Sequence, residues 1–200
     1  MSSSSASRAQ RTPPTLRQGD RFRVSSNSGS VREARFIYEG EHESGWIIRL
    51  KDGRIARLDP TRIDWSTHEL LEDDGSPLWV AGDEFALSTP ANTVQGHLLK
   101  PITEEVSLRV DDDWDMRLPL ASVKTAAIRF RAAGLKTGDR FEIKSRSGTE
   151  YVGTVIDSTA DSVKVVSEGG EPLTLRLRRL DLDTLFVLVP ITLTSPGHAA

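Results

Sequence analysis

The chain has 200 residues, of which 26 are basic and 29 acidic, giving a formal net charge of −3. This balance counts against a protein that holds nucleic acid mainly by electrostatic attraction, because such proteins are often strongly basic. The chain contains no cysteine, which excludes disulfides, thiolate metal sites and cysteine nucleophiles.

The N-terminal segment, residues 1–15, is predicted to be a disordered Ser-rich tail that ends at Pro13-Pro14. Its basic residues and lack of acids leave an organellar transit peptide as an alternative. It lacks the apolar stretch of a secretory signal, and no run in the chain approaches the roughly 20 apolar residues of a membrane helix. We therefore expect no membrane partner and a cytoplasmic location, in a bacterium or a phage.

A Gly-Asp pair followed by Phe occurs three times, as Gly19-Asp20, Gly82-Asp83 and Gly138-Asp139. The first and third occurrences belong to segments whose apolar positions align over some forty residues, which indicates an internal repeat. We interpret each pair as a turn that begins a strand, with Gly relaxing the backbone and Asp capping free amides. A repeated binding loop is the alternative interpretation.

Each copy is predicted to contain five short strands. In the third copy, Leu173, Leu175 and Leu177 alternate with polar residues, which is the period of a strand with one buried face. Gly153 marks a sharp bend in the second strand, and Pro190 is expected to end the fifth. No segment has a convincing helical period; residues 126–133 are the only weak candidate.

Five strands with a bend at a glycine in the second one resemble the SH3-like/Sm-like family of small barrels. The resemblance covers Leu16 to Pro190. It implies an all-β fold of three tandem five-stranded SH3-like/Sm-like small barrels, joined by short linkers into a semi-rigid arc. The predicted divisions are a disordered tail (1–15), barrel 1 (16–71), barrel 2 (78–130, acidic and divergent), barrel 3 (135–190) and a C-terminal tail (191–200).

The nucleotide pocket of Sm-like proteins typically has an Asp and an Asn after the second strand, and an Arg-Gly pair near the fourth and fifth. The third copy has Thr159-Ala160-Asp161-Ser162 and Arg178-Arg179-Leu180-Asp181 at these places. Because the Asn and the Arg-Gly pair are missing, we do not expect an Sm-type RNA pocket.

Basic residues gather around two predicted fourth strands, where they could contact phosphate or an acidic protein. A solvated strand face is the alternative. In copy one they are Arg49, Lys51, Arg54, Arg57 and Arg62, and in copy three Arg176, Arg178 and Arg179.

The middle copy has five basic and eight acidic residues, and its densest carboxylate cluster is Asp111, Asp112, Asp113 and Asp115. A tight metal-binding loop would need a glycine that this segment lacks. The four histidines also show no metal-ligand spacing. We therefore predict a solvated acidic turn, no metal and no cofactor.

The fifth strand of the third copy is apolar on both faces. Its residues are Leu185, Phe186, Val187, Leu188 and Val189. An edge strand of an isolated barrel should keep one polar face. We therefore expect a neighbouring copy, the C-terminal tail or another chain to cover the second face, and predict a protein-binding edge here.

These patterns contain no set of residues typical of an active site, so an enzyme is not expected. They favour a non-catalytic binding or assembly module that engages a protein partner or self-assembles. The alternative is an RNA- or DNA-binding protein that uses the Arg-rich fourth-strand surfaces of barrels 1 and 3.

Overall fold

A computed structural model describes residues 13–40, 45–111 and 113–193, and this part of the chain is all-β. Most of the two predicted tails and Asp112 lie outside the described residues. Within the described ranges there are fifteen strands, three short 3-10 turns and no α-helix.

The strands follow one another along the chain with the 3-10 turns η2, η3 and η4 placed before each fifth strand. They are β1 (Arg21–Ser26), β2 (Val31–Glu39), β3 (Trp46–Leu50), β4 (Ile55–Leu58), η2 (Pro60–Arg62), β5 (Ile63–Leu71), β6 (Glu84–Ser88), β7 (Thr93–Leu98), β8 (Glu105–Val110), β9 (Trp114–Pro119), η3 (Leu120–Ser122), β10 (Thr125–Arg131), β11 (Arg140–Ser145), β12 (Glu150–Ser158), β13 (Ser162–Ser167), β14 (Pro172–Arg176), η4 (Leu177–Arg179) and β15 (Leu180–Ile191).

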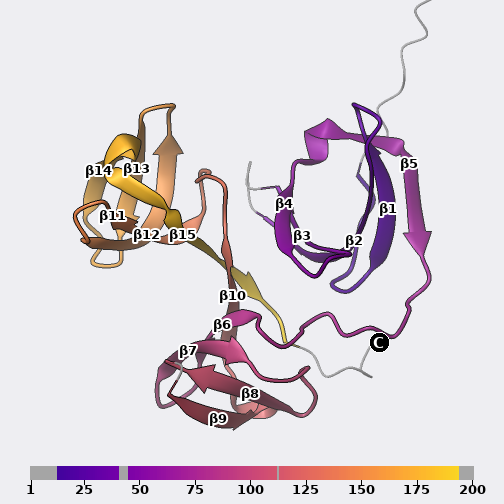
Figure 1. Cartoon of the computed structure of the whole chain (residues 1–200), viewed down its shortest axis with the longest axis horizontal. Coiled ribbons are helices and arrows are strands. Elements are labelled where there is room, and N and C mark those ends of the chain that lie inside the picture. The colour runs from indigo at the N-terminus through magenta and orange to yellow at the C-terminus, as the bar shows by residue number, and fades with distance from the viewer. Residues whose placement is uncertain (1–12, 41–44, 112, 194–200) are drawn as a thin grey trace, which may run out of the picture.

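The strands form two antiparallel sheets, one of five strands in the order β4-β3-β2-β1-β5 and one of ten in the order β14-β13-β12-β11-β15-β10-β6-β7-β8-β9. The same five-strand order therefore occurs three times, and we name the segments lobe 1 (β1–β5), lobe 2 (β6–β10) and lobe 3 (β11–β15) (Figure 1). The prediction of an all-β fold is confirmed. The predicted closed barrels differ from the observed open sheets, because each 3-10 turn redirects the chain and the fourth strand is not paired with the fifth.

Lobes 2 and 3 share one sheet because their fifth strands pair with each other. β10 runs antiparallel to β15, with Arg129 opposite Leu188 at the centre of the ladder (Figure 1). The weak helix candidate at 126–133 is thus mostly strand. The expected end of the last strand at Pro190 was also wrong, since β15 continues to Ile191 and Pro190 lies opposite Ala127. Cross-strand packing between lobes overrides the local preferences of these residues.

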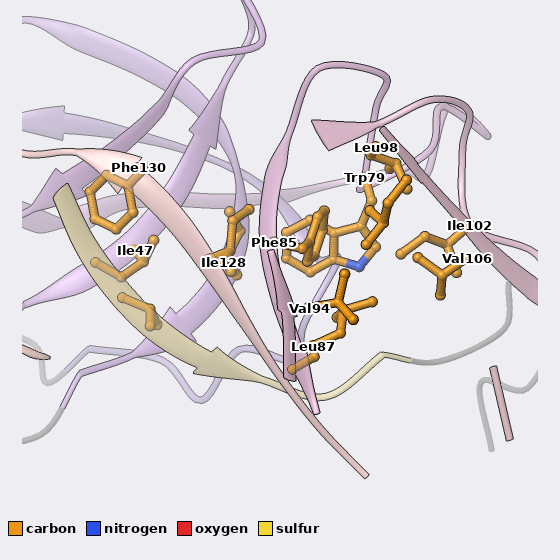
Figure 2. Close-up of a cluster of buried hydrophobic side chains, with 14 of the residues drawn as sticks. Ile47, Trp79, Phe85, Leu87, Val94, Leu98, Ile102, Val106, Ile128 and Phe130 are labelled. Atoms are coloured by element: carbon orange, nitrogen blue, oxygen red, sulfur yellow. The ribbon is translucent and has the colours of Figure 1, made fainter. Parts of the chain in front are cut away.

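Each lobe has an apolar interior built around the Phe that follows its Gly-Asp pair. Phe22, Phe85 and Phe141 are all fully buried. The interior of lobe 2 extends to the first lobe: Ile47 of β3 belongs to the same buried cluster as Phe85, Ile128 and Phe130 (Figure 2). Lobe 1 is thus packed against the other two.

A glycine in the second strand of lobes 2 and 3 lets the third strand approach closely. Gly96 lies opposite Phe85, and Gly153 lies opposite Phe141. A Cβ atom at Gly96 would lie 2.5 Å from the carbonyl oxygen of Arg109, and one at Gly153 would lie 2.3 Å from that of Val166. Both contacts are with backbone, so the bend depends on the missing side chain.

Replacing this glycine should therefore destabilise the fold. We expect Gly153→Ala to lower the free energy of unfolding by about 1–3 kcal/mol, measured by urea unfolding, because the new methyl group must displace strand β13. Gly134→Ala is the matched control, since a Cβ there meets no atom within 4 Å. Equal stability of the two variants would contradict the close approach.

Candidate functional site

The three Gly-Asp pairs have the same local geometry. Each Asp carboxylate accepts a hydrogen bond from the backbone amide three residues earlier, at 2.7 Å for Asp20, 2.8 Å for Asp83 and 2.7 Å for Asp139. The glycines before them have φ values of +96°, +92° and +89°. The interpretation of these pairs as capped turns is confirmed.

The outer face of lobe 1 is unusual because it is buried as well as the inner face. Trp46 and Ile48 of β3 point into the core of lobe 1, while Ile47 lies on the opposite face and joins the cluster of lobe 2. Arg49 also lies on this outer face, and Arg57 of β4 is directly opposite Ile47. One face of β3 and β4 therefore presents apolar and basic side chains to the other lobes.

Two ion pairs cross from this face, one to each of the other lobes. Arg49 Nη2 donates to Asp83 Oδ2 of lobe 2 at 2.5 Å, and Arg57 Nη2 donates to Asp139 Oδ1 of lobe 3 at 2.7 Å. The side chains of Arg49 and Asp83 are 6% and 9% exposed, and those of Arg57 and Asp139 are 15% and 3% exposed. The aspartates of the second and third Gly-Asp turns therefore have a second function: they hold lobe 1 in place. We call the four residues the arginine clamp.

The clamp is buried enough to alter the acid–base behaviour of its carboxyl groups. Burial raises the pKa of Asp83 and of Asp139, and the adjacent guanidinium groups of Arg49 and Arg57 oppose this rise only in part. The Nε atoms of both arginines are buried without a hydrogen-bond partner. The clamp therefore fixes the position of the lobes at a substantial desolvation cost.

A cavity of about 290 Å³ lies where the three lobes meet. Its wall includes Tyr38, Ile47 and Arg57 of lobe 1, Ala127 of lobe 2 and Asp139 of lobe 3. Apolar surface dominates, and both arginines of the wall are ion-paired within the chain, Arg57 with Asp139 and Arg140 with Glu168. The cavity brings together groups from all three lobes, but its described lining residues include no nucleophile with an adjacent base.

The apolar fifth strand of lobe 3 lies at the junction of lobes 2 and 3. Leu185, Val187, Leu188 and Val189 are buried. The guanidinium groups of Arg129 and Arg131 lie over the ring of Phe186, with their Cζ atoms 3.4 and 5.3 Å from the ring centroid. A neighbouring lobe covers part of this strand, because β10 pairs with it, and Ile191 and Leu193 of the predicted C-terminal tail pack against the same cluster as Val187 and Val189. A further protein-binding role for this strand stays a prediction.

The basic residues chosen from the sequence are divided by the structure into paired and unpaired groups. Arg49 and Arg57 belong to the clamp, while the exposed Arg54 and Arg62 pair with Asp52 and Asp59. The remaining members are exposed and form no ion pair with any described residue: Lys51, Arg176, Arg178 and Arg179. The clamp role of Arg49 was missed, although its place in the apolar run Trp46-Ile47-Ile48 was a signal for burial.

Two strands at the ends of the ten-stranded sheet have one unpaired edge. They are β9 in lobe 2 and β14 in lobe 3, and neither has a second partner strand among the described residues. Trp114 at the start of β9 is 49% exposed, and Leu173 in β14 is 38% exposed. Each edge has a row of backbone donors and acceptors without a strand partner among the described residues.

The described residues contain no group of three His, Asp or Glu side chains arranged to hold a metal ion. Their ranges also contain no helix that is long and apolar enough to cross a membrane. His68 packs against the rings of Phe22 and Trp65, with its Nε2 atom buried and without a partner. A scan of protein-family models and a search of curated proteins found no match to the chain.

Breaking the arginine clamp should cost much more than breaking an exposed pair. We expect Arg49→Met to lower the free energy of unfolding by about 3–5 kcal/mol, because Asp83 stays buried without its counter-charge. The double variant Arg49→Met/Asp83→Asn should recover part of the loss, since the Asn keeps an acceptor for the amide of Val80.

Arg54→Met is the control for this experiment, because its partner Asp52 is exposed and the expected change is within about 0.5 kcal/mol. Urea unfolding of all three variants gives the comparison. A loss for Arg49→Met no larger than that for Arg54→Met would rule out an energetic role for the clamp.

The clamp also predicts a specific pH dependence. The pKa of Asp139 in the folded state is raised above its usual 3.8. Its contribution to the free energy of unfolding is therefore fully present below about pH 3.8 and is lost as the pH rises through the raised pKa. The stability of the wild type minus that of Asp139→Asn should therefore fall as the pH is raised from 4 towards neutrality.

Asp74→Asn gives a control of opposite sign. Hydrogen bonds from Ser76 and the nearby Arg35 hold the pKa of Asp74 below its usual range, so its contribution is lost on acidification. The free energy of unfolding of the wild type minus that of Asp74→Asn should thus grow as the pH rises. Urea unfolding across the same pH series would test this. Parallel curves for the two variants would contradict the burial of Asp139.

Proposed function

We propose that the protein is a non-catalytic assembly module that binds protein through the unpaired edges of its sheet. In this proposal the three lobes are tandem copies of one SH3-like/Sm-like small-barrel unit, held by the arginine clamp as a single rigid scaffold. The observation that carries the proposal is the pairing of β10 with β15, because it demonstrates within the chain that these units join edge to edge.

The repeat is supported by features that recur at the same place in each lobe. The strand order, the capped Gly-Asp turn and the buried Phe of the first strand are common to all three. The 3-10 turn after the fourth strand also recurs. Such agreement between sequence alignment and topology favours copies of one unit over three unrelated β segments.

A scaffold function is favoured by the strand edges that remain unpaired when the three lobes pack together. The apolar strand β15 and the clamp arginines are used within the chain, whereas the edges of β9 and β14 have no partner among the described residues. A free edge offers a row of backbone donors and acceptors to an extended partner strand. Trp114 adds an exposed aromatic side chain, the residue type most often found at binding hot spots.

A second candidate, nucleic-acid binding, is favoured by one observation. Arg176, Arg178 and Arg179 are exposed and form no ion pair within the described part of the chain, and the backbone carbonyl of Arg179 accepts a hydrogen bond from the amide of Arg146. Four arginines therefore lie in one part of lobe 3. Phosphate binding by them would weaken steeply with salt, in contrast to binding by a strand edge.

The proposal is tested by capture on the immobilised full chain from nuclease-treated extract of its native host. We expect specific proteins to be retained at high salt and to be lost with Trp114→Lys, which places a charge beside the β9 edge. Val31→Lys is the matched control, because Val31 is 63% exposed on β2, an inner strand of the other sheet.

The two candidates give different results in this experiment. Capture that disappears on nuclease treatment, and that is abolished by replacing Arg176, Arg178 and Arg179 with Gln, would replace the assembly proposal by nucleic-acid binding. Retention unaffected by either set of substitutions would contradict both.

A further inference from the structure

The two free edges of the ten-stranded sheet are similar in length and belong to different lobes. β9 has six residues in lobe 2, and β14 has five in lobe 3. We propose that β9 of one copy of this chain pairs antiparallel with β14 of a second copy, so that the ten-stranded sheets join head to tail. The inference rests on the assembly function proposed above and names the partner.

Charge complementarity is the first argument for a second copy. The β9 edge is preceded by Asp111 and Asp113, which are exposed and form no ion pair with any described residue. It contains the exposed Asp115, which pairs with Arg109 of the neighbouring strand β8. The β14 edge ends in Arg176 and is followed by Arg178, both exposed and likewise without an ion pair among the described residues. Apart from Arg117 in β9 and Glu171 next to β14, the exposed charges named at one edge are acidic and those at the other are basic, so unlike edges attract.

The alternation of side chains is the second argument. An antiparallel register with Asp115 opposite Arg176 places Met116 opposite Leu175 and Leu118 opposite Leu173. Asp113, in the turn before β9, and Arg178, in η4 after β14, flank this ladder at the same end. An acidic residue therefore faces a basic one within the ladder, and a second pair of opposite charges lies beside it.

The apolar pairs of this register also lie on the correct face. Met116 and Leu118 are cross-strand neighbours of the fully buried Leu108 and Val106. Leu175 and Leu173 are cross-strand neighbours of the buried Val163 and Val165. Joining the edges continues one apolar face and one polar face across both sheets. A slip of one residue would place apolar opposite charged side chains, so this register is specified.

The chain itself provides the third argument. β10 and β15 are fifth strands of different lobes, and they already join antiparallel edges into one sheet. The proposed contact repeats that arrangement with fourth strands. Because the contact uses two different surfaces, it is heterologous, and repeated association gives a ring if the rotation closes and a filament if it does not.

Cysteine cross-linking tests the register, because the chain has no natural cysteine. Arg117 and Thr174 are exposed and lie directly opposite each other in the proposed ladder. We expect the full-length Arg117→Cys/Thr174→Cys variant to form covalent dimers and larger multimers under mild oxidation. The control Arg117→Cys/Glu171→Cys, three positions out of register at another exposed residue, should stay monomeric on denaturing gels. Equal multimer formation by both variants would overturn the proposed register.

Association without cross-linking gives the second measurement. The wild-type mass in light scattering should rise with concentration, and Arg176→Glu should raise the apparent dissociation constant on the order of tenfold or more, because like charges then face each other. Arg54→Glu, an equally exposed substitution on lobe 1, should leave association unchanged.

The failures of the two proposals are distinguishable. A wild-type chain that stays monomeric at every concentration and forms no cross-link, yet retains nuclease-resistant proteins in a Trp114-dependent manner, would overturn self-assembly and leave the assembly function standing. Absence of both self-association and capture would overturn both.

Discussion

Two arginines on one face of lobe 1 determine how the rest of the chain is arranged. Arg49 donates to the carboxylate of Asp83 in lobe 2, and Arg57 donates to that of Asp139 in lobe 3. Between them, Ile47 enters the apolar cluster shared with Phe130. Apolar burial supplies the favourable free energy of this contact, whereas the ion pairs make its geometry specific, because a displaced lobe would leave charges buried without partners.

The clamp acts symmetrically because lobes 2 and 3 are themselves related by an approximate two-fold axis. In the β10–β15 ladder Ile128 lies opposite Val189, and Phe130 lies opposite Val187. Ile128 and Val187 also occupy equivalent positions, since they pair with Phe85 and Phe141 respectively. Lobe 1 packs across this two-fold junction and contacts the equivalent aspartate on each side. The same kind of capped turn therefore binds lobe 1 at two places, once in lobe 2 and once in lobe 3.

The division of charged residues connects this architecture to the proposed function. Arg49 and Arg57 face the interior and pair with Asp83 and Asp139, whereas Arg176, Arg178 and Arg179 lie exposed at the β14 end of the ten-stranded sheet. Asp111, Asp113 and Asp115 lie exposed at the β9 end. A rigid body with unlike free ends is suited to directional association, and the apolar residues that a binding surface would otherwise expose are mostly covered by neighbouring lobes.

Sequence alone determined the features that depend on local chemistry. The capped Gly-Asp turns and the glycine at position 153 follow from turn geometry and backbone sterics, and each has its expected role. The predicted alternation holds only at Leu175, because Leu173 is 38% exposed and Leu177 lies in η4. The sequence also indicated that β15 must be covered. It did not determine by what, nor that Arg49 and Arg57 face inward, because pairing between strands 60 residues apart depends on how whole lobes pack. Only the tertiary structure decided which apolar and charged faces meet, and therefore which edges remain free.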